Sequence, residues 1–267
     1  MTPGFSSAQR HGEQPLALFV SDVHLDPAAA KGSAADATRS AFLRFLQHAN
    51  QAPALYLLGD IFEYWAGDDD LDAPEHADWL AALQSLHEQG VQLYWIAGNR
   101  DFLAGAAFAK RCGITLLAEN HVLQCGPANI LLCHGDAACT DDHEYMAFRA
   151  QARTPAWQQA FLARPLAQRK AMIAQMRAHS MQRQAGMGAQ AMLLDVNQDS
   201  IAALLDAYDC RILLHGHTHR PQCHRWQRDG LNYERHVLPD WDVGAGRGGY
   251  IRLEADGSLS HWRLQQD

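Results

Sequence analysis

Aspartate, histidine and asparagine side chains recur in five short motifs along the 267-residue chain. In order, the motifs read SDVH, GD, GNRD, CHGD and GHTH, and their metal-competent side chains are Asp22, His24, Asp60, Asn99, His134, His217 and His219. Imidazoles combined with carboxylates suit manganese, iron or zinc better than magnesium or calcium alone. Two such ions about 3.5–4 Å apart can hold both the attacking and the leaving oxygen of an in-line displacement at phosphorus. The pattern predicts a two-metal phosphoesterase site in which Asp60 bridges the ions.

Each motif follows an apolar run that is typical of a buried strand. The runs are Leu16–Val20, Ala54–Leu58, Val91–Ile96, Ile130–Cys133 and Arg211–Leu214. Ligands of open α/β sheets lie beyond the carboxyl ends of the strands, so we expect the motifs to converge. A single D-x-H or G-H-x-H could be a loop or a hydrogen-bonded core histidine, but five motifs in this order are hard to explain as independent accidents.

Segments with the apolar spacing of a helix lie between the strand-like runs, and this alternation favours an α/β fold. Thr38–Ala49 and Glu75–Gln89 both place apolar residues on one face, and Gly90 ends the second helix. After Pro221 the pattern changes to short strand-like runs with turn residues. We interpret this part of the chain as a second, mostly antiparallel sheet.

Residues 143–194 differ in composition from the rest of the chain. They hold six of the seven methionines and carry seven basic residues against one acid, a net charge of +6 in a chain of formal charge −8. We interpret them as a helical insertion for substrate and acyl-chain binding, between core segments 16–142 and 195–267 and after an N-terminal extension of residues 1–15. Methionine at helical spacing is more often ordinary core, and arginine on a helix is usually solvated, so composition alone leaves this role open.

The bulk properties restrict the class of protein. The negative charge gives a nucleic-acid partner no general electrostatic support. The six cysteines contain no C-x-x-C pair, which argues against a zinc knuckle and favours free thiols in a reducing cytoplasm. The first residues lack the charged-then-apolar pattern of a signal peptide, and no apolar run is long enough to span a bilayer.

The motif series D-x-H, G-D, G-N-x-D, H-G-D, G-H-x-H resembles the calcineurin-like metallophosphoesterase superfamily. The resemblance implies a four-layer α/β/β/α sandwich of two mixed sheets. It also implies that one ion is held by Asp22, His24, Asp60 and His219. The other would be held by Asp60, Asn99, His134 and His217.

The fourth motif departs from the superfamily pattern, because GNRD carries Arg100 where G-N-H-D is usual. Arginine does not donate its proton at ordinary pH, but its fork fits phosphate oxygens and neutralises their charge. A site without a general acid favours a leaving group that is already a weak base, such as a phosphate monoester. Arg100 therefore favours a pyrophosphate substrate over an alkyl phosphodiester, although a purely structural pairing with Asp101 is the alternative.

Longer strings around the motifs resemble the UDP-2,3-diacylglucosamine pyrophosphohydrolase family of lipid A biosynthesis. They are LGDIFEYWAGDD, AGNRDF, LCHGDAACTDDHEYMAFR and LLDVN. The resemblance implies cleavage of UDP-2,3-diacylglucosamine to UMP and 2,3-diacylglucosamine 1-phosphate, with two Mn²⁺ or other divalent transition metals. It implies a peripheral protein at the cytoplasmic face of the inner membrane. The oligomeric state is left open.

The same resemblance implies the substrate contacts. Asn99 and Arg100 are expected to act on the phosphate, and the full expected contact set is Asn99, Arg100, Asp142, Tyr145, Ser180 and His217. A basic residue in the second half of the insertion is also expected at the phosphate. Residues 181–192 are hard to align, and Arg183 is the candidate there.

Two other functions remain open from the motifs alone. A soluble nucleotide pyrophosphatase or phosphodiesterase of the same superfamily would explain the metals but not the methionine-rich basic insertion. A metal-stabilised scaffold without catalysis is disfavoured, because structural metal sites need no paired, open arrangement.

Overall fold

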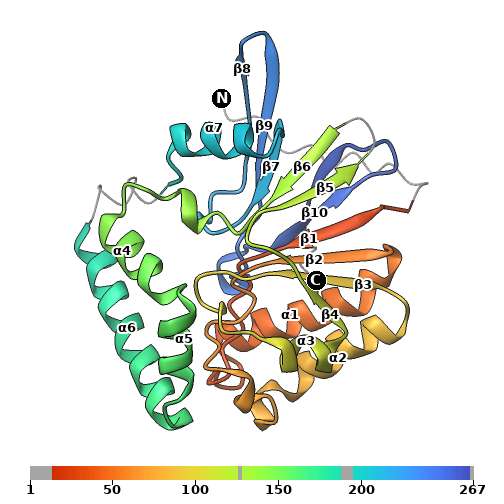
Figure 1. Ribbon diagram of the computed structural model, residues 1–267. Helices are drawn as coiled ribbons and strands as arrows, with labels where there is room; N and C mark the ends of the chain where they lie inside the picture. The colour runs from red at the N-terminus through yellow and green to blue at the C-terminus, as the bar shows by residue number, and fades with distance from the viewer. Residues whose placement is uncertain (1–13, 126–127, 188–194, 265–267) are drawn as a thin grey trace.

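The computed structural model describes residues 14–125, 128–187 and 195–264 of the chain. Two β-sheets pack face to face, with helices on the outer face of each (Figure 1). This is the four-layer α/β arrangement of two mixed sheets that we expected. Within the described residues, no helix is long and apolar enough to span a membrane.

The first sheet has the strand order β11-β10-β1-β2-β3-β4. Its strands are β1 (Ala17–Val20), β2 (Ala54–Leu58), β3 (Gln92–Ile96), β4 (Ile114–Leu116), β10 (Gly249–Leu253) and β11 (Leu259–Arg263). β1 to β4 run parallel to one another, β10 is antiparallel to β1, and the edge strand β11 is antiparallel to β10. The carboxyl ends of β1, β2 and β3 therefore lie at one edge of the sandwich.

The second sheet has the order β5-β6-β7-β9-β8. Its strands are β5 (His121–Cys125), β6 (Ala128–Leu132), β7 (Ile212–His215), β8 (Cys223–Arg228) and β9 (Leu231–Val237). β6, β7 and β9 are parallel, and β5 and β8 are antiparallel edge strands. The ends of β6 and β7 thus supply the remaining predicted motifs.

The continuous apolar runs arise because the central strands are buried on both faces. Ala17 and Phe19 of β1 pack in the cluster between the sheets, together with Leu132 of β6 and Leu214 of β7. The alternate residues of β1, such as Val20, point to the other face of the sheet and pack in the cluster beneath the first layer of helices.

Helices α1 (Ala34–His48), α2 (Ala77–Glu88) and α3 (Ala106–Cys112) pack on the outer face of the first sheet, and α7 (Gln198–Ala207) covers the second (Figure 1). Ser33 caps α1 by accepting a hydrogen bond from the Asp36 N–H. Phe42 and Phe45 of α1 are buried against the sheet. Both predicted helices are therefore present, within a few residues of their expected ends.

The interpretation of the segment after Pro221 as a separate antiparallel sheet was wrong. β8 and β9 extend the second sheet, and β10 and β11 extend the first. Local sequence pattern identifies strands but not their neighbours, since pairing depends on which buried edge each strand meets.

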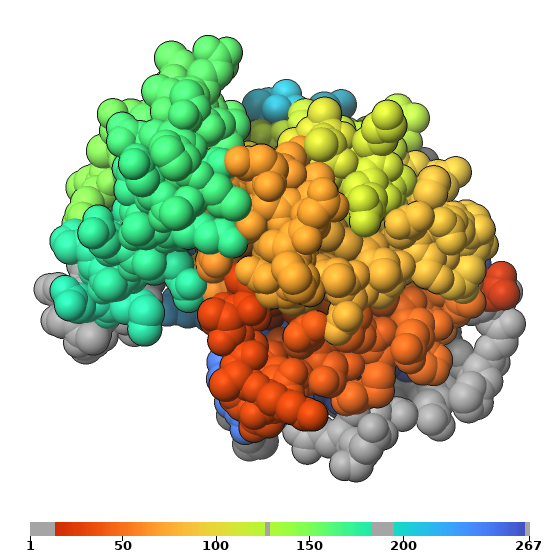
Figure 2. All heavy atoms as spheres, turned by 90° about the horizontal axis from the view of Figure 1, so that it is seen from below, coloured from red at the N-terminus to blue at the C-terminus, as the bar shows by residue number. Residues whose placement is uncertain are grey.

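The described part of residues 143–194 forms three helices: α4 (His143–Ala152), α5 (Pro155–Leu162) and α6 (Leu166–Met187). They form a wall at one side of the sandwich, which the space-filling view shows in green beside the orange segment that follows β2 (Figures 1 and 2). Phe161 of α5 is buried in the main core cluster. We call α4, α5 and α6 the helical wall.

Candidate metal centre and substrate cavity

All seven predicted metal ligands follow strand ends. Asp22 and His24 follow β1, Asp60 follows β2 and Asn99 follows β3, while His134 follows β6 and His217 and His219 follow β7. Direct bonds join the loops from the two sheets: the His217 backbone N–H donates to Asp22 Oδ2 at 2.9 Å. The convergence expected from the sequence is present in the structure.

The ligand loops have unusual backbone conformations. Seven non-glycine residues in the described part of the chain have positive φ, and five of them are predicted ligands: Asp22, His24, Asp60, His217 and His219. Such conformations typically cost about 1–3 kcal/mol each and persist where the surrounding structure enforces them. The fold therefore maintains backbone strain at this cluster.

The glycines of the motifs leave room for the ligands. Gly59 has a φ of +83°, and a Cβ there would lie 2.7 Å from His134 Nδ1. A Cβ on Gly98 would overlap the Asp60 carboxylate. The G-D and G-N pairs are thus explained by close backbone approach as well as by turn geometry.

The first ligand group contains Asp22, His24 and His219. Their ligand atoms all lie within 4.8 Å of one another. His24 Nε2 and His219 Nε2 are 3.2 Å apart, and His219 Nε2 lies 3.4 Å from Asp22 Oδ1. Two imidazoles and one carboxylate therefore face a common point.

The second group contains Asp60, His134 and His217, again with ligand atoms within 4.8 Å of one another. His134 Nε2 lies 3.6 Å from Asp60 Oδ2 and 3.1 Å from Asn99 Oδ1. The other nitrogen of His134, Nδ1, lies 2.9 Å from the Leu58 carbonyl oxygen, so it donates there and leaves Nε2 as the ligand atom.

The charges of these groups favour a bound cation. Burial alone would raise the pKa of Asp60, but the neighbouring His134 outweighs it and holds the pKa below its ordinary range. Burial also disfavours charge on His134, yet Asp60 raises its pKa to about 10. Asp22 Oδ1 is buried and has no hydrogen-bond partner, which is costly for a carboxylate. The donor set therefore fits divalent metal ions.

Asp101 stabilises the loops that carry Asp60 and Asn99. Its Oδ2 accepts from the Ile61 N–H at 2.9 Å, and its Oδ1 accepts from the Gly98 N–H at 2.8 Å. Asp101 is fully buried. Its hydrogen bonds come from backbone N–H groups, so the geometry does not support the alternative in which Arg100 pairs with Asp101.

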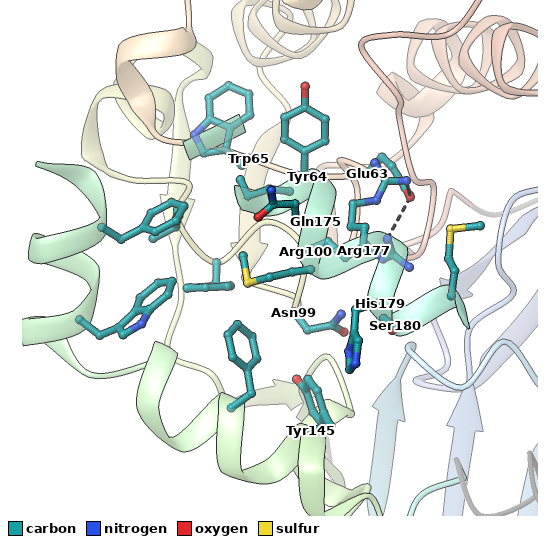
Figure 3. A pocket seen from close by; sticks show the side chains of 18 of the residues that line it. Glu63, Tyr64, Trp65, Asn99, Arg100, Tyr145, Gln175, Arg177, His179 and Ser180 are labelled. Carbon is teal, nitrogen blue, oxygen red and sulfur yellow. Dashed lines mark hydrogen bonds and ion pairs between the residues drawn. The ribbon is translucent and has the colours of Figure 1, made fainter. Parts of the chain in front are cut away.

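Arg100 instead faces Glu63. Arg100 Nη1 donates to Glu63 Oε1 at 2.9 Å, and the two residues lie close together at the cavity (Figure 3). Glu63 Oε2 lies 3.0 Å from His24 Nδ1. Arg177 of α6 pairs with the same Glu63 oxygen. One carboxylate thus orients a metal ligand and two arginines. The sequence motifs did not indicate Glu63 or Arg177, although Glu63 lies inside one of the strings that resemble the family.

A second network ties the helical wall to the metal loops. Asp136 of the CHGD motif accepts from the Tyr145 hydroxyl at 2.5 Å and from Arg149 Nε at 2.8 Å. Arg153 Nη2 donates to the Gly98 carbonyl oxygen at 2.9 Å. α4 is therefore held against both the loop after β3 and the loop after β6.

A cavity of about 500 Å³ opens between the metal loops and the helical wall (Figure 3). One side is polar and includes Glu63, Asn99 and Arg100. The other side is apolar and comes mainly from α4, α5 and α6. Its large apolar residues are Phe102, Leu103, Phe148, Trp157, Phe161, Ile173, Met176 and Met181.

Four of the expected substrate contacts, Asn99, Arg100, Tyr145 and Ser180, line this cavity (Figure 3). His217 lies in the second ligand group, with its ring 6.1 Å from that of Tyr145. Asp142 serves as the N-cap of α4, accepting from the Tyr145 N–H at 3.1 Å.

Three methionines of α6 differ in what they contact. Met176 and Met181 line the cavity, whereas Met172 packs against the main core. Met172 therefore does not line this cavity. In the segment 181–192, which was hard to align, the side chains of Arg183 and of the residues after it lie outside the described side chains.

A family model for calcineurin-like phosphoesterases matches residues 16–221. A UDP-2,3-diacylglucosamine hydrolase from Aromatoleum aromaticum is 43% identical over 244 residues, covering 90% of this chain and 94% of the relative. A protein of the same name from Enterobacter sp. (strain 638) is 41% identical and covers 90% of this chain and 95% of the relative.

Among solved structures, similarity extends to an archaeal phosphodiesterase at 8% identity, with a TM-score of 0.44 and coverage of 93% of this chain and 99% of that one. A phosphopantetheinyl hydrolase from Mycobacterium tuberculosis is 16% identical, with a TM-score of 0.41 and coverage of 86% and 91%. The sequence relatives, together with the five motifs and the two ligand groups, decide the family: the chain belongs to the calcineurin-like phosphoesterases and, within them, to the UDP-2,3-diacylglucosamine hydrolases.

Proposed function

We propose that this chain hydrolyses the pyrophosphate bond of UDP-2,3-diacylglucosamine, giving UMP and 2,3-diacylglucosamine 1-phosphate in lipid A biosynthesis. The observation that carries the proposal is the cavity, which Asn99 and Arg100 line together with a set of large apolar side chains, most of them from the helical wall. A substrate with a diphosphate and two acyl chains matches both kinds of lining at once. The names of the relatives point to the same substrate.

The metal assignment is part of the proposal. Asp22, His24, Asp60 and His219 would hold one Mn²⁺, and Asp60, Asn99, His134 and His217 would hold the other. When bound, the ions activate water and neutralise charge on the phosphoryl group. The low pKa of His217, about 4 because of burial and the nearby His134, keeps its imidazole neutral and able to bind a metal.

The residues of the chain then bind and orient the diphosphate. Arg100 lies beside Asn99 at the polar side of the cavity, with its side chain 32% exposed and its backbone N–H fixed on Asp60 Oδ1 at 2.9 Å. Its guanidinium neutralises phosphoryl charge and donates no proton. The departing sugar phosphate needs none, because its second pKa is about 6. Arg177, held by the same Glu63, supplies the basic residue expected from the insertion.

The insertion, residues 143–194, contains the helical wall and interrupts a core formed by 16–142 and 195–267. It supplies the acyl-chain chamber, with Tyr145 and Ser180 near the sugar and Asp142 fixing the start of α4. Four of the eight exposed large apolar side chains among the described residues lie on it: Phe148, Leu162, Met176 and Met181. Together with its net positive charge, they support peripheral contact with the cytoplasmic face of the inner membrane.

A nucleotide pyrophosphatase without a lipid substrate is the second candidate. It would use the same metal ligands and Arg100, but its substrate would have no apolar group to contact the apolar side chains of the cavity. Hydrolysis of UDP-2,3-diacylglucosamine in heavy-oxygen water with Mn²⁺ tests both points. We expect label in UMP and strong preference for the diacylated over the deacylated sugar nucleotide. Label in the sugar phosphate would contradict the proposed attack at the uridine-linked phosphorus, and equal turnover of both substrates would favour the second candidate.

A further inference from the structure

A third group of metal-competent side chains lies on the β8–β9 hairpin. The ligand atoms of Cys223, Glu234 and His236 all lie within 4.8 Å of one another. Cys223 and His236 are directly opposed cross-strand partners, and Glu234 is two residues before His236 on β9. Because side chains alternate along a strand, all three project from one face of the hairpin. None of them belongs to the ligand groups of the two-metal centre.

This face of the hairpin turns toward the first sheet. Leu238, two residues beyond His236, is buried in the cluster between the sheets. His236 is 2% exposed, and its Nδ1 lies 3.1 Å from Nε2 of His261 on β11. β8 and β11 are the last strands of their respective sheets. The cluster therefore sits where the edges of the two sheets meet.

The distances suit a zinc-class ion. Cys223 Sγ lies 3.7 Å from His236 Nε2, and zinc bonds of about 2.3 Å to sulfur and 2.0–2.1 Å to nitrogen place tetrahedral S and N ligands about 3.6 Å apart. Glu234 Oε2 lies 2.9 Å from the same nitrogen. Its other oxygen, Oε1, accepts from Arg225 Nε at 2.9 Å, which orients the carboxylate. Tetrahedral nitrogen and oxygen ligands of zinc lie about 3.4 Å apart, so Oε2 must move away from Nε2 by about 0.5 Å to complete a three-ligand site.

The hydrogen bonding of His236 points the same way. A neutral imidazole has one N–H and one lone pair. If Nδ1–H donates to His261, the Nε2 lone pair faces the Glu234 carboxylate and the Cys223 sulfur. A cation between these three atoms satisfies them all, and a second hydrogen-bond partner on the far nitrogen is what metal-bound histidines have. The competing arrangement, with the proton on Nε2, is a plain hydrogen-bonded cluster.

We propose that Cys223, Glu234 and His236 bind one zinc-class divalent ion on the β8–β9 hairpin, with His261 of β11 orienting His236 and water in the fourth position. Thiolate and imidazole ligands select zinc or cobalt over the hard ions that carboxylates alone attract. The Cys223 proton passes to solvent on binding.

Cobalt is the probe, because a thiolate ligand gives Co²⁺ an intense near-ultraviolet charge-transfer absorption. The ligands assigned to the two-metal centre are nitrogen and oxygen atoms only, so that centre gives no such band. The full chain, stripped of metals and reloaded with Mn²⁺, is titrated with Co²⁺. We expect one equivalent of thiolate-bound cobalt in the wild type and none in Cys223→Ser.

Cys125→Ser is the matched control, since Cys125 is also half-buried and free on β5 of the same sheet. It should keep the band. Glu234→Gln keeps the thiol and should weaken Co²⁺ binding by at least about tenfold, because even groups that only orient a ligand contribute about 10–100-fold. Mn²⁺-dependent hydrolysis by Cys223→Ser should match wild type, which checks its fold. Absence of the band in the wild type, or its survival in Cys223→Ser, would overturn the proposal in favour of the hydrogen-bonded cluster.

Discussion

The ligand loops and the helical wall face one another across the cavity but are built in different ways. Each ligand loop follows a buried strand, so a few consecutive residues determine where its side chains lie. The wall is held by contacts between distant parts of the chain, such as Arg153 on the Gly98 carbonyl and Arg177 on Glu63. The comparison suggests a division of roles: chemistry in the loops, and selection of an acylated substrate in the wall. The predictions below test this division, beginning with the largest effect.

The shared ligand should be the most sensitive position in the loops. Asp60→Asn removes the proposed bridging carboxylate, so turnover should fall by more than the ~10²–10³-fold that one preorganised contact contributes, and bound manganese should fall with it. Metal content and kcat are the measurements. Asp206→Asn, at an exposed ion pair with Arg228 on the far side of the second sheet, is the control and should behave as wild type. Near-normal activity of Asp60→Asn with excess Mn²⁺ would be incompatible with a shared ligand.

Arg100 should contribute to the rate without holding metal. Arg100→Ala should lower kcat by about 10²–10³-fold with manganese content preserved. Arg100→Lys should recover only part of the loss, because lysine lacks the bidentate fork. Arg100→His introduces a proton donor that the phosphate leaving group does not need. If the histidine variant equals wild type on the pyrophosphate, charge stabilisation is not the role of this residue.

Two methionines on α6 have different surroundings, so their variants test which face of the helix lines the cavity. Met176 lines the cavity and Met172 packs against the main core. Met176→Asp should raise KM for the diacylated substrate by roughly tenfold, about 1.4 kcal/mol, and change Tm little. Met172→Asp should instead lower Tm by roughly 3–10 °C. If the two variants exchange these effects, the cavity lining has been assigned to the wrong face of α6.

The smallest expected effect concerns pH and the junction between the wall and the core. Burial lowers the pKa of His76 below 6.5, although its partner Asp70, which also pairs with Lys170 of α6, opposes the shift. The unfolded chain therefore binds a proton more readily than the folded one just below pH 6.5, and the free energy of unfolding should fall as pH falls through that range.

His76→Gln should flatten this pH dependence, measured by denaturant unfolding of the Mn²⁺-loaded protein. His48→Gln, at an exposed position on α1, is the control and should leave the slope unchanged. An unaltered slope in His76→Gln would mean that the proton affinity of His76 is the same in both states.

The sequence predicted the parts of the molecule that depend on neighbouring residues. Asp22, Asp60 and His134 could be placed because each follows an apolar run, and a glycine lies directly beside Asp60 and His134. Glu63 and Arg177 could not, because they are 114 residues apart and meet only when α6 packs beside the loop after β2. For the same reason, helical spacing did not distinguish Met172 from Met176.

The pairing of the last strands could not be predicted from the sequence for a similar reason. The runs after Pro221 were recognisable as strands, but their division between two sheets depends on which edge each one meets. The Cys223–His236 pair follows from that division, since the two residues become neighbours only through the register of β8 and β9.

The most direct test of the division of roles is a comparison of kcat/KM on UDP-2,3-diacylglucosamine and on its deacylated analogue for wild type, Arg100→Ala and Met176→Asp. Loss of Arg100 should lower both values by the same factor, because both substrates carry the same diphosphate. Loss of Met176 should lower only the value for the diacylated substrate. If Met176→Asp lowers both equally, or Arg100→Ala affects only one, the loops and the wall do not divide chemistry from substrate selection.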